Sequence, residues 1–142
     1  MARDTASEVS LQPSRARTAL GPVGGKVLVV DDDQHFRLLA RSMLESGGFE
    51  VIESEDVAHC LSQLRRYAVD AVVLDMVMPG RDGIEAVREL KGLYPEIRIL
   101  AVSGAEQGDL YLSVSAHLGA DASLEKARIG ALCPLLQLVL ER

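Results

Sequence analysis

The stretch Val27-Leu28-Val29-Val30-Asp31-Asp32-Asp33 places four consecutive apolar residues directly before three carboxylates. Most of the apolar residues are β-branched, and a short run of this kind is typical of a strand that is buried on both faces. Further strands are predicted along the chain, as buried apolar runs at 71–74 and 97–102 and as shorter strands at 50–53 and 122–125. In the stretches between these strands, apolar residues recur with the period of an α-helix. The sequence therefore predicts an α/β fold, a three-layer sandwich in which five helices cover a five-stranded parallel sheet.

The predicted helices carry apolar residues that recur at helical spacing. The first helix has a stripe formed by Phe36, Leu39, Ala40, Met43 and Leu44. Asp56 is the expected N-cap of the second helix, and a less regular helix is expected over 106–118. The last helix contains Pro134, which lacks the N–H that continues the hydrogen-bond ladder, so we expect a kink there.

The length and charge of the chain restrict its class. Its 142 residues suit one folded domain, which we expect over 26–142, after a flexible N-terminal arm over 1–25. The 15 basic and 21 acidic residues give a net charge of -6, the wrong sign for a surface that follows nucleic-acid phosphates. No apolar run is long enough to span a membrane. We therefore expect no direct nucleic-acid partner and no membrane partner.

The two cysteines, Cys60 and Cys133, lie on apolar helical stripes and lack the spacing of a metal site. They are interpreted as buried thiols in a reducing compartment, which predicts a cytoplasmic location.

Polar residues follow four of the five predicted strands. The first strand is followed by the carboxylates quoted above, and later strands by Asp75, Ser103 and Lys126. Because parallel strands end at the same edge of a sheet, these side chains should meet in one crevice. Clustered carboxylates repel one another unless a cation joins them, and Mg²⁺ suits an open cleft of this kind. With Mg²⁺ present, Asp75 is a candidate nucleophile toward phosphorus, and Ser103 and Lys126 would contact phosphoryl oxygens.

Four segments resemble, in order and at suitable spacing, the receiver domain of bacterial two-component response regulators of the single-domain type. They are 27–33, Asp75-Met76-Val77-Met78-Pro79-Gly80-Arg81-Asp82-Gly83, Val102-Ser103-Gly104-Ala105, and Gly119-Ala120-Asp121 followed by Lys126. The resemblance extends from about Lys26 to Arg142. It implies a flavodoxin-like fold with strand order 2-1-3-4-5.

The resemblance also implies roles for these residues. Asp75 would accept the phosphoryl group, Ser103 would be the switch hydroxyl, and Lys126 would pair with the phosphoryl group. The ligands of Mg²⁺ would be Asp31, Asp32, Asp75 and the backbone carbonyl of Val77. The donor would be a phosphohistidine on a sensor histidine kinase or a histidine phosphotransfer protein. The signal would pass to a downstream protein target, and a phosphorylation-dependent dimer is one form this output could take.

Two positions depart from the family's pattern. Ser123 stands where the family usually has an aromatic residue, so the aromatic half of the usual switch is missing. Ala127 follows the lysine, where a proline in a cis bond is usual, and a non-proline cis bond would cost about 3 kcal/mol.

Three functional hypotheses follow. The first is a signalling module that is controlled by phosphorylation and has only a modest self-phosphorylation and dephosphorylation activity. The second is a receiver-like scaffold that acts independently of phosphorylation, which the departures at Ser123 and Ala127 keep open. The third is a phosphatase of the haloacid dehalogenase type, whose Asp-x-Asp pattern Asp31 and Asp33 could mimic. The third is disfavoured because Gln34 stands where that motif has Thr or Val.

Overall fold

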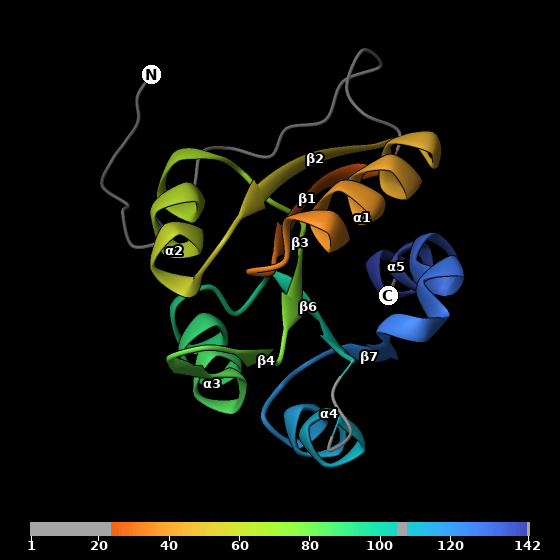
Figure 1. The fold of residues 1–142 in the computed structure, drawn as a ribbon. Helices are drawn as coiled ribbons and strands as arrows, with labels where there is room; N and C mark the ends of the chain where they lie inside the picture. The colour runs from red at the N-terminus through yellow and green to blue at the C-terminus, as the bar shows by residue number, and fades with distance from the viewer. Residues whose placement is uncertain (1–23, 105–107, 142) are drawn as a thin grey trace.

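The structure is a computed structural model that describes residues 24–104 and 108–141. Its main sheet has five parallel strands in the order β2-β1-β3-β6-β7 (Figure 1). Their bounds are β1 Gly25–Val30, β2 Phe49–Ser54, β3 Ala71–Asp75, β6 Arg98–Ser103 and β7 Ala122–Glu125. Counted along the chain, the strands of this sheet have the order 2-1-3-4-5. The predicted fold class and strand order are confirmed.

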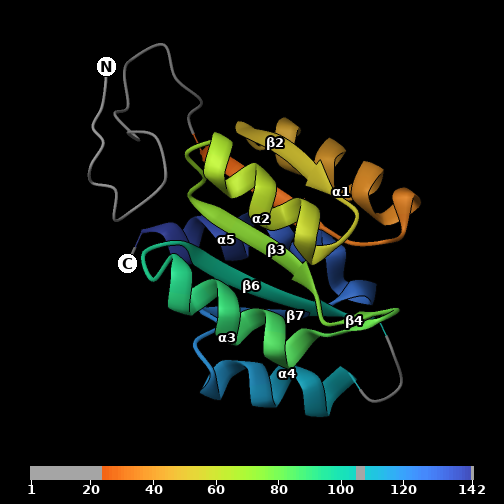
Figure 2. The ribbon, with the colours of Figure 1, turned by 90° about the vertical axis from the view of Figure 1, so that its left-hand side faces the viewer.

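Helices cover both faces of the sheet (Figures 1 and 2). Their bounds are α1 Gln34–Ser46, α2 Val57–Arg66, α3 Gly83–Leu93, α4 Gly108–His117 and α5 Leu132–Leu140. Helices α1 and α5 lie on one face, and α2, α3 and α4 lie on the other. This arrangement is the predicted three-layer sandwich.

The central strands carry continuous apolar stretches because each strand contributes to two cores. In β1, Leu28 and Val30 pack toward α2 and α3, whereas Val27 and Val29 pack toward α1 and α5. Successive side chains of a strand point to opposite faces, so a strand covered on both sides needs an unbroken apolar run. The polar residue that follows such a run is the first to reach the edge of the sheet.

Aspartates cap three of the helices. The side chain of Asp33 accepts a hydrogen bond from the N–H of His35, and Asp56, as predicted, accepts one from His59. Asp82 does the same for Ile84 at the start of α3. Each of these carboxylates satisfies an N–H that has no partner within its helix.

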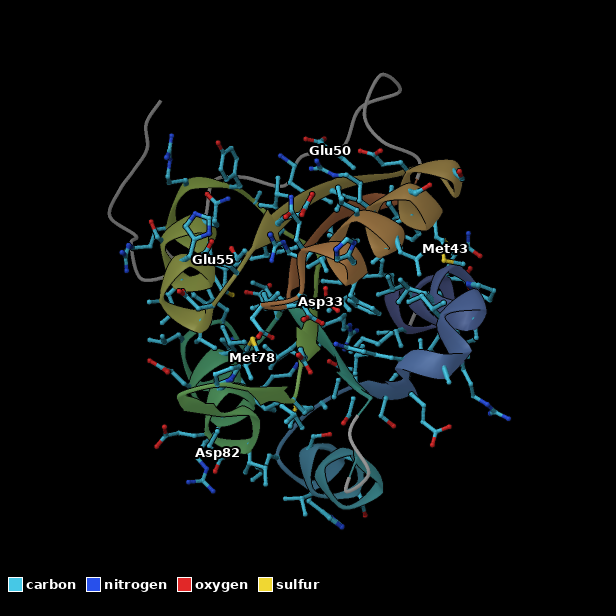
Figure 3. The ribbon with its side chains drawn as sticks, viewed as in Figure 1. Asp33, Met43, Glu50, Glu55, Met78 and Asp82 are labelled. Carbon is cyan, nitrogen blue, oxygen red and sulfur yellow. The ribbon has the colours of Figure 1, made fainter. Side chains whose placement is uncertain are left out.

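A small antiparallel hairpin follows β3 and was not predicted. It consists of β4 Val77–Met78 and β5 Arg81–Asp82, and Figure 3 shows Met78 and Asp82 on it. Gly80, in the turn, has a φ of 75°, a conformation that residues with a Cβ rarely adopt. The hairpin leads from the end of β3 directly into α3.

The kink expected at Pro134 in the last helix is wrong. A 3₁₀ segment, η2 Lys126–Ala131, precedes α5, and the break in helical geometry lies at Arg128, with φ -107° and ψ 29°. Helix α5 starts at Leu132, so Pro134 lies in its first turn, where a missing N–H removes no hydrogen bond.

Leu39 also departs from the prediction, since its side chain is 48% exposed. It lies at the edge of the buried stripe of α1. Helix α5 contacts the C-terminal part of α1, where the thiol of Cys133 donates a hydrogen bond to the backbone carbonyl of Met43. Met43 is labelled in Figure 3. Cys133 is accordingly only partly buried, whereas Cys60 is fully buried as predicted.

Most of the predicted N-terminal arm, residues 1–23, and the start of the helix expected over 106–118 lie outside the described residues. Among the helices that the structure does describe, none has the length and apolarity required to cross a membrane.

Candidate functional site

The sheet brings the predicted polar residues to its carboxyl edge. Val30 is paired with Leu74, so Asp31 and Asp75, which follow them, lie side by side at the ends of β1 and β3. Ser103 ends β6, and Lys126 directly follows β7. The residues that were predicted from four separate strands therefore share one edge.

Three carboxylates form a cluster at this edge. One oxygen from each of Asp31, Asp32 and Asp75 can be chosen so that the three lie within 4.8 Å of one another. Asp31 and Asp75 are buried, and Asp32 is exposed. Asp33 is not part of this cluster, because its side chain caps α1. The cluster thus has two buried members and one that faces solvent.

Backbone N–H groups orient the two buried carboxylates. The N–H of Asp33 donates to Asp31 Oδ1 at 2.8 Å, and the N–H of Val77 donates to Asp75 Oδ1 at 3.1 Å. The other oxygens approach Lys126, whose Nζ lies 2.7 Å from Asp31 Oδ2 and 3.6 Å from Asp75 Oδ2. The ammonium therefore lies between the two buried carboxylates.

The protonation of Asp75 reflects this crowding. Burial, and then the charge of Asp31, raise the pKa of the Asp75 carboxyl from 3.8 to about 7, although the Val77 N–H and the Lys126 ammonium act in the opposite direction. Burial disfavours the charge on Lys126, but the Asp31 and Asp75 carboxylates outweigh it and raise the lysine pKa. The site thus holds more negative charge than one ammonium balances.

The donor set fits a hard divalent cation. Mg²⁺ prefers carboxylate oxygens and retains several waters, so an open cluster with one exposed member suits it. Asp31 Oδ2 is buried and lies 2.7 Å from the Lys126 ammonium, the cation it faces in this structure. A buried carboxylate oxygen is stabilised by a neighbouring cation, and a metal ion at the cluster would act in the same sense. The raised pKa of Asp75 points the same way, since a second cation would stabilise its ionised form.

The structure also describes Ser103, Ser123 and the bond after Lys126. Ser103 is buried at the end of β6, in register with Glu125, the residue before Lys126. Ser123 is exposed on β7, in register with Ala101, so no aromatic side chain occupies this position. The bond between Lys126 and Ala127 is trans, since no cis peptide occurs in the described residues. The direction of the Val77 carbonyl toward a metal stays a prediction.

Two further residues contact the site, and the sequence reasoning did not identify either of them in this role. Arg37 donates from Nη1 to the backbone carbonyl of Asp31 at 2.6 Å and from Nε to Glu53 at 3.0 Å. Phe36 lies under the ammonium of Lys126, with 4.5 Å between Nζ and the ring centroid. Both lie in the first turn of α1, so their spacing from Asp31 could be read from the sequence. Their partners Glu53 and Lys126 are distant in the sequence and could not be.

Comparisons with known proteins agree with this geometry. The family described as "Response regulator receiver domain" matches residues 27–133. The chain is 32% identical over 88 residues to the chemotaxis protein CheY of Bacillus subtilis, which covers 61% of this chain and 73% of CheY. It is 38% identical over 103 residues to the transcriptional regulatory protein FixJ of Bradyrhizobium diazoefficiens, which covers 72% of this chain. The matched part is 49% of FixJ, so the chain spans about half of that relative.

Solved structures also resemble the chain. A response regulator from Thermotoga maritima superposes with a TM-score of 0.75 and 26% identity, covering 87% of this chain and 100% of that structure. A response regulator receiver domain protein from Clostridium thermocellum superposes with a TM-score of 0.76 and 25% identity, covering 83% of this chain and 95% of that one.

Proposed function

Because this chain belongs to the family of response regulator receiver domains, and is therefore a phospho-accepting signalling module, we propose that Asp75 is the residue that accepts the phosphoryl group. The observation that carries this proposal is the position of the Asp75 carboxylate. It is buried at the end of β3, clustered with Asp31 and Asp32, and 3.6 Å from the Lys126 ammonium.

The proposed transfer needs an ionised Asp75. One carboxylate oxygen forms a bond to phosphorus while the bond from phosphorus to the donor breaks, and the donor leaves with the electron pair and takes a proton from water. With a phosphohistidine donor, the leaving group is imidazole. Asp75 Oδ1 already accepts the N–H of Val77, whereas Oδ2 faces Lys126, so Oδ2 is the oxygen that we assign to attack.

Receiver domains generally bind Mg²⁺ at an acidic pocket, and we propose that Asp31, Asp32 and Asp75 hold it here, together with the carbonyl of Val77. When bound, the ion neutralises the carboxylates and the charge of the transferred phosphoryl oxygens. Asp32 is the exposed ligand, so it reaches the ion from the solvent side.

The roles of Lys126 and Ser103 follow from their places at the edge. The ammonium of Lys126 stabilises the negative charge on the phosphoryl oxygens that the metal does not contact. The hydroxyl of Ser103, on the strand next to β3, is proposed as the switch that senses the modification. With Ser123 exposed and not aromatic, the signal must leave this edge without the usual aromatic partner.

Receiver domains interact with histidine kinases and phosphotransfer proteins, and we propose a phosphohistidine on such a protein as the donor. A downstream protein target, a phosphorylation-dependent dimer and a cytoplasmic location remain proposals of the same kind. The family assignment lends no support to the two other hypotheses. In particular, Asp33 caps α1 and Asp31 pairs with Lys126, so neither is arranged as a phosphatase pair.

The proposal is tested by incubating the protein with Mg²⁺ and acetyl phosphate and recording intact mass. We expect one added phosphoryl group in the wild type and none in Asp75→Asn. Asp70→Asn is the matched control, because Asp70 is buried in the segment leading into β3, where it binds the N–H of Lys26 far from the site edge. Equal labelling of Asp75→Asn would remove Asp75 from the role.

A further inference from the structure

The ammonium of Lys126 has an aromatic neighbour that is not part of the carboxylate cluster. Its Nζ lies over the ring of Phe36, 4.5 Å from the centroid. The face of an aromatic ring carries partial negative charge and attracts a cation at this distance. Lys126 therefore has three partners: the two buried carboxylates on one side and the ring of Phe36 on another.

The ring is firmly placed relative to the cluster. Phe36 is 8% exposed and packs in the core between the sheet and α1 and α5. It lies in the first turn of α1, whose N-cap is Asp33. The N–H of the same Asp33 binds Asp31 Oδ1. The short segment from Asp31 to Phe36 thus carries both a buried carboxylate and the ring, so their separation changes little.

Lys126, in contrast, begins a segment of the chain that lies at the surface. The residue after it, Ala127, is exposed, and the 3₁₀ segment that begins at Lys126 contains no buried residue. The side chain is 24% exposed. Its stem passes Gly104, where an added Cβ would lie 3.2 Å from Lys126 Cδ. The contacts that hold the head of the lysine are those with Asp31, Asp75 and Phe36.

We propose that Phe36 is a positioning residue for Lys126. Its ring face holds the ammonium at the carboxyl edge, between Asp31 and Asp75, where the phosphoryl group is to arrive. This inference rests on the proposed role of Asp75 as the acceptor. Phe36 does not touch the phosphoryl group in this account, and it acts only through Lys126.

Variants can distinguish the effect of the aromatic ring of Phe36 from the effect of its apolar volume. Phe36→Leu keeps an apolar side chain in the core but removes the ring, whereas Phe36→Tyr retains a ring face. The other phenylalanine of the chain, Phe49, offers a matched control. It is buried in the same core, but it lies at the start of β2, where it packs against Gly24.

The first test is spectroscopic and uses the protein without metal or phosphodonor. The chain has three lysines, so ¹³C-labelled lysine gives three ε-methylene signals. We expect ring-current shifts of the Lys126 ε-protons in the wild type and in Phe36→Tyr, and their loss in Phe36→Leu. Phe49→Leu should leave them unchanged. An unshifted Lys126 signal in the wild type, or one unaffected by Phe36→Leu, would overturn the proposal.

The second test measures the rate of labelling by acetyl phosphate. Loss of a cation–π contact of ordinary strength should slow Phe36→Leu by about two- to tenfold, while Phe36→Tyr and Phe49→Leu stay near the wild-type rate. Equal slowing of Phe36→Leu and Phe36→Tyr would assign a packing role to the residue and contradict positioning.

Replacing phenylalanine by its ring-fluorinated analogues gives a third test, which preserves the shape of the side chain and does not depend on the folding of Phe36→Leu. Each ring fluorine weakens the negative face, so the labelling rate should fall stepwise from mono- to trifluorinated protein. The same series in a Phe49→Leu background should fall equally. A rate that is independent of fluorination contradicts the proposal.

Failure of this inference can be distinguished from failure of the proposed function. If Asp75 is not the acceptor, Asp75→Asn still becomes labelled, and the ring-current result is unaffected.

Discussion

Lys126 Nζ lies 2.7 Å from Asp31 Oδ2, so a lysine that follows β7 forms an ion pair with a buried carboxylate that follows β1. The Asp31 side chain is fully buried, whereas that of Lys126 is 24% exposed. In this structure the ammonium therefore supplies the positive charge that the buried carboxylate requires. A metal ion in the acidic cluster would share this carboxylate with Lys126.

The first prediction concerns the competition between Lys126 and a metal ion for the carboxylate of Asp31. Lys126→Met removes a positive charge next to the proposed metal ligands. Mg²⁺ should therefore bind this variant several-fold more tightly than it binds the wild type, a difference in binding free energy of about 1 kcal/mol. Labelling by acetyl phosphate should nevertheless be slower, since the phosphoryl oxygens lose their cation. Calorimetric titration with Mg²⁺ measures the first effect and intact-mass kinetics the second. Weaker Mg²⁺ binding in Lys126→Met would show that the lysine supports the metal site instead of competing with it.

The second prediction concerns pH. The pKa of Asp75 is raised to about 7 in the folded protein, against 3.8 for an ordinary carboxyl. Between these values the folded state binds more protons at Asp75 than the unfolded state, so raising the pH lowers the free energy of unfolding. In Asp75→Asn this loss of stability is absent. Without metal at pH 8, the free energy of unfolding of the variant should therefore exceed that of the wild type by about 1–3 kcal/mol.

Urea unfolding of both proteins at pH 4 and pH 8, in the presence of a chelator, checks this. The difference between the two proteins should be small at pH 4 and large at pH 8, and Mg²⁺ should reduce it by stabilising only the wild type. A difference that does not change with pH would mean that the Asp75 carboxyl titrates in its ordinary range.

The third prediction concerns Arg37, which binds the carbonyl of Asp31 as well as Glu53. Arg37→Met releases the backbone of a proposed metal ligand, so Mg²⁺ affinity should fall by about two- to fivefold. Arg41→Met is the matched control, because Arg41 binds Glu53 and the carbonyl of Val51, and in the described part of the chain it has no contact with the carboxylate cluster. Both variants should lose about 1 kcal/mol of stability, and only Arg37→Met should lose metal affinity. Equal metal affinities would refute the positioning role of Arg37.

The fourth prediction concerns the junction between the hairpin and α3. A Cβ on Gly83 would lie 2.3 Å from the carbonyl oxygen of Met76, a contact that forces the backbone apart. Gly83→Ala should therefore destabilise the protein by about 2–3 kcal/mol and slow labelling at the adjacent Asp75. Gly92→Ala, in the same helix with open space around it, should be neutral or stabilising. Thermal unfolding of the pair distinguishes the steric effect from helix propensity.

The sheet and the edge residues were predictable because their signal is local. An unbroken apolar run such as 27–30 reports a strand covered on both faces, and the next polar residue must then reach the edge. The same argument placed Asp75 and Ser103, whereas the strand before Lys126 contains Ser123 and Glu125, so Lys126 was placed only by its position after the fifth strand. It needs only the order of residues along the chain and the rule that parallel strands share one polarity.

Contacts between distant elements were not predictable in this way. The exposure of Leu39 depends on where α5 crosses α1, and the contact of Phe36 with Lys126 depends on the path of the backbone after β7. The kink expected at Pro134 was wrong because the start of α5 is set by the 3₁₀ segment before it. Helical periodicity gives the face of a helix but neither its first residue nor its neighbours.

The most direct measurement of the central claim is to locate the phosphoryl group. The protein is labelled with acetyl phosphate and Mg²⁺, the acyl phosphate is reduced with borohydride, and the peptides are sequenced by mass spectrometry. We predict that the reduced residue is Asp75, and that Asp32→Asn lowers the yield while Asp33→Asn, which retains a capping side chain on α1, does not. A modified residue at Asp31 or Asp33, with Asp75 intact, would contradict the account.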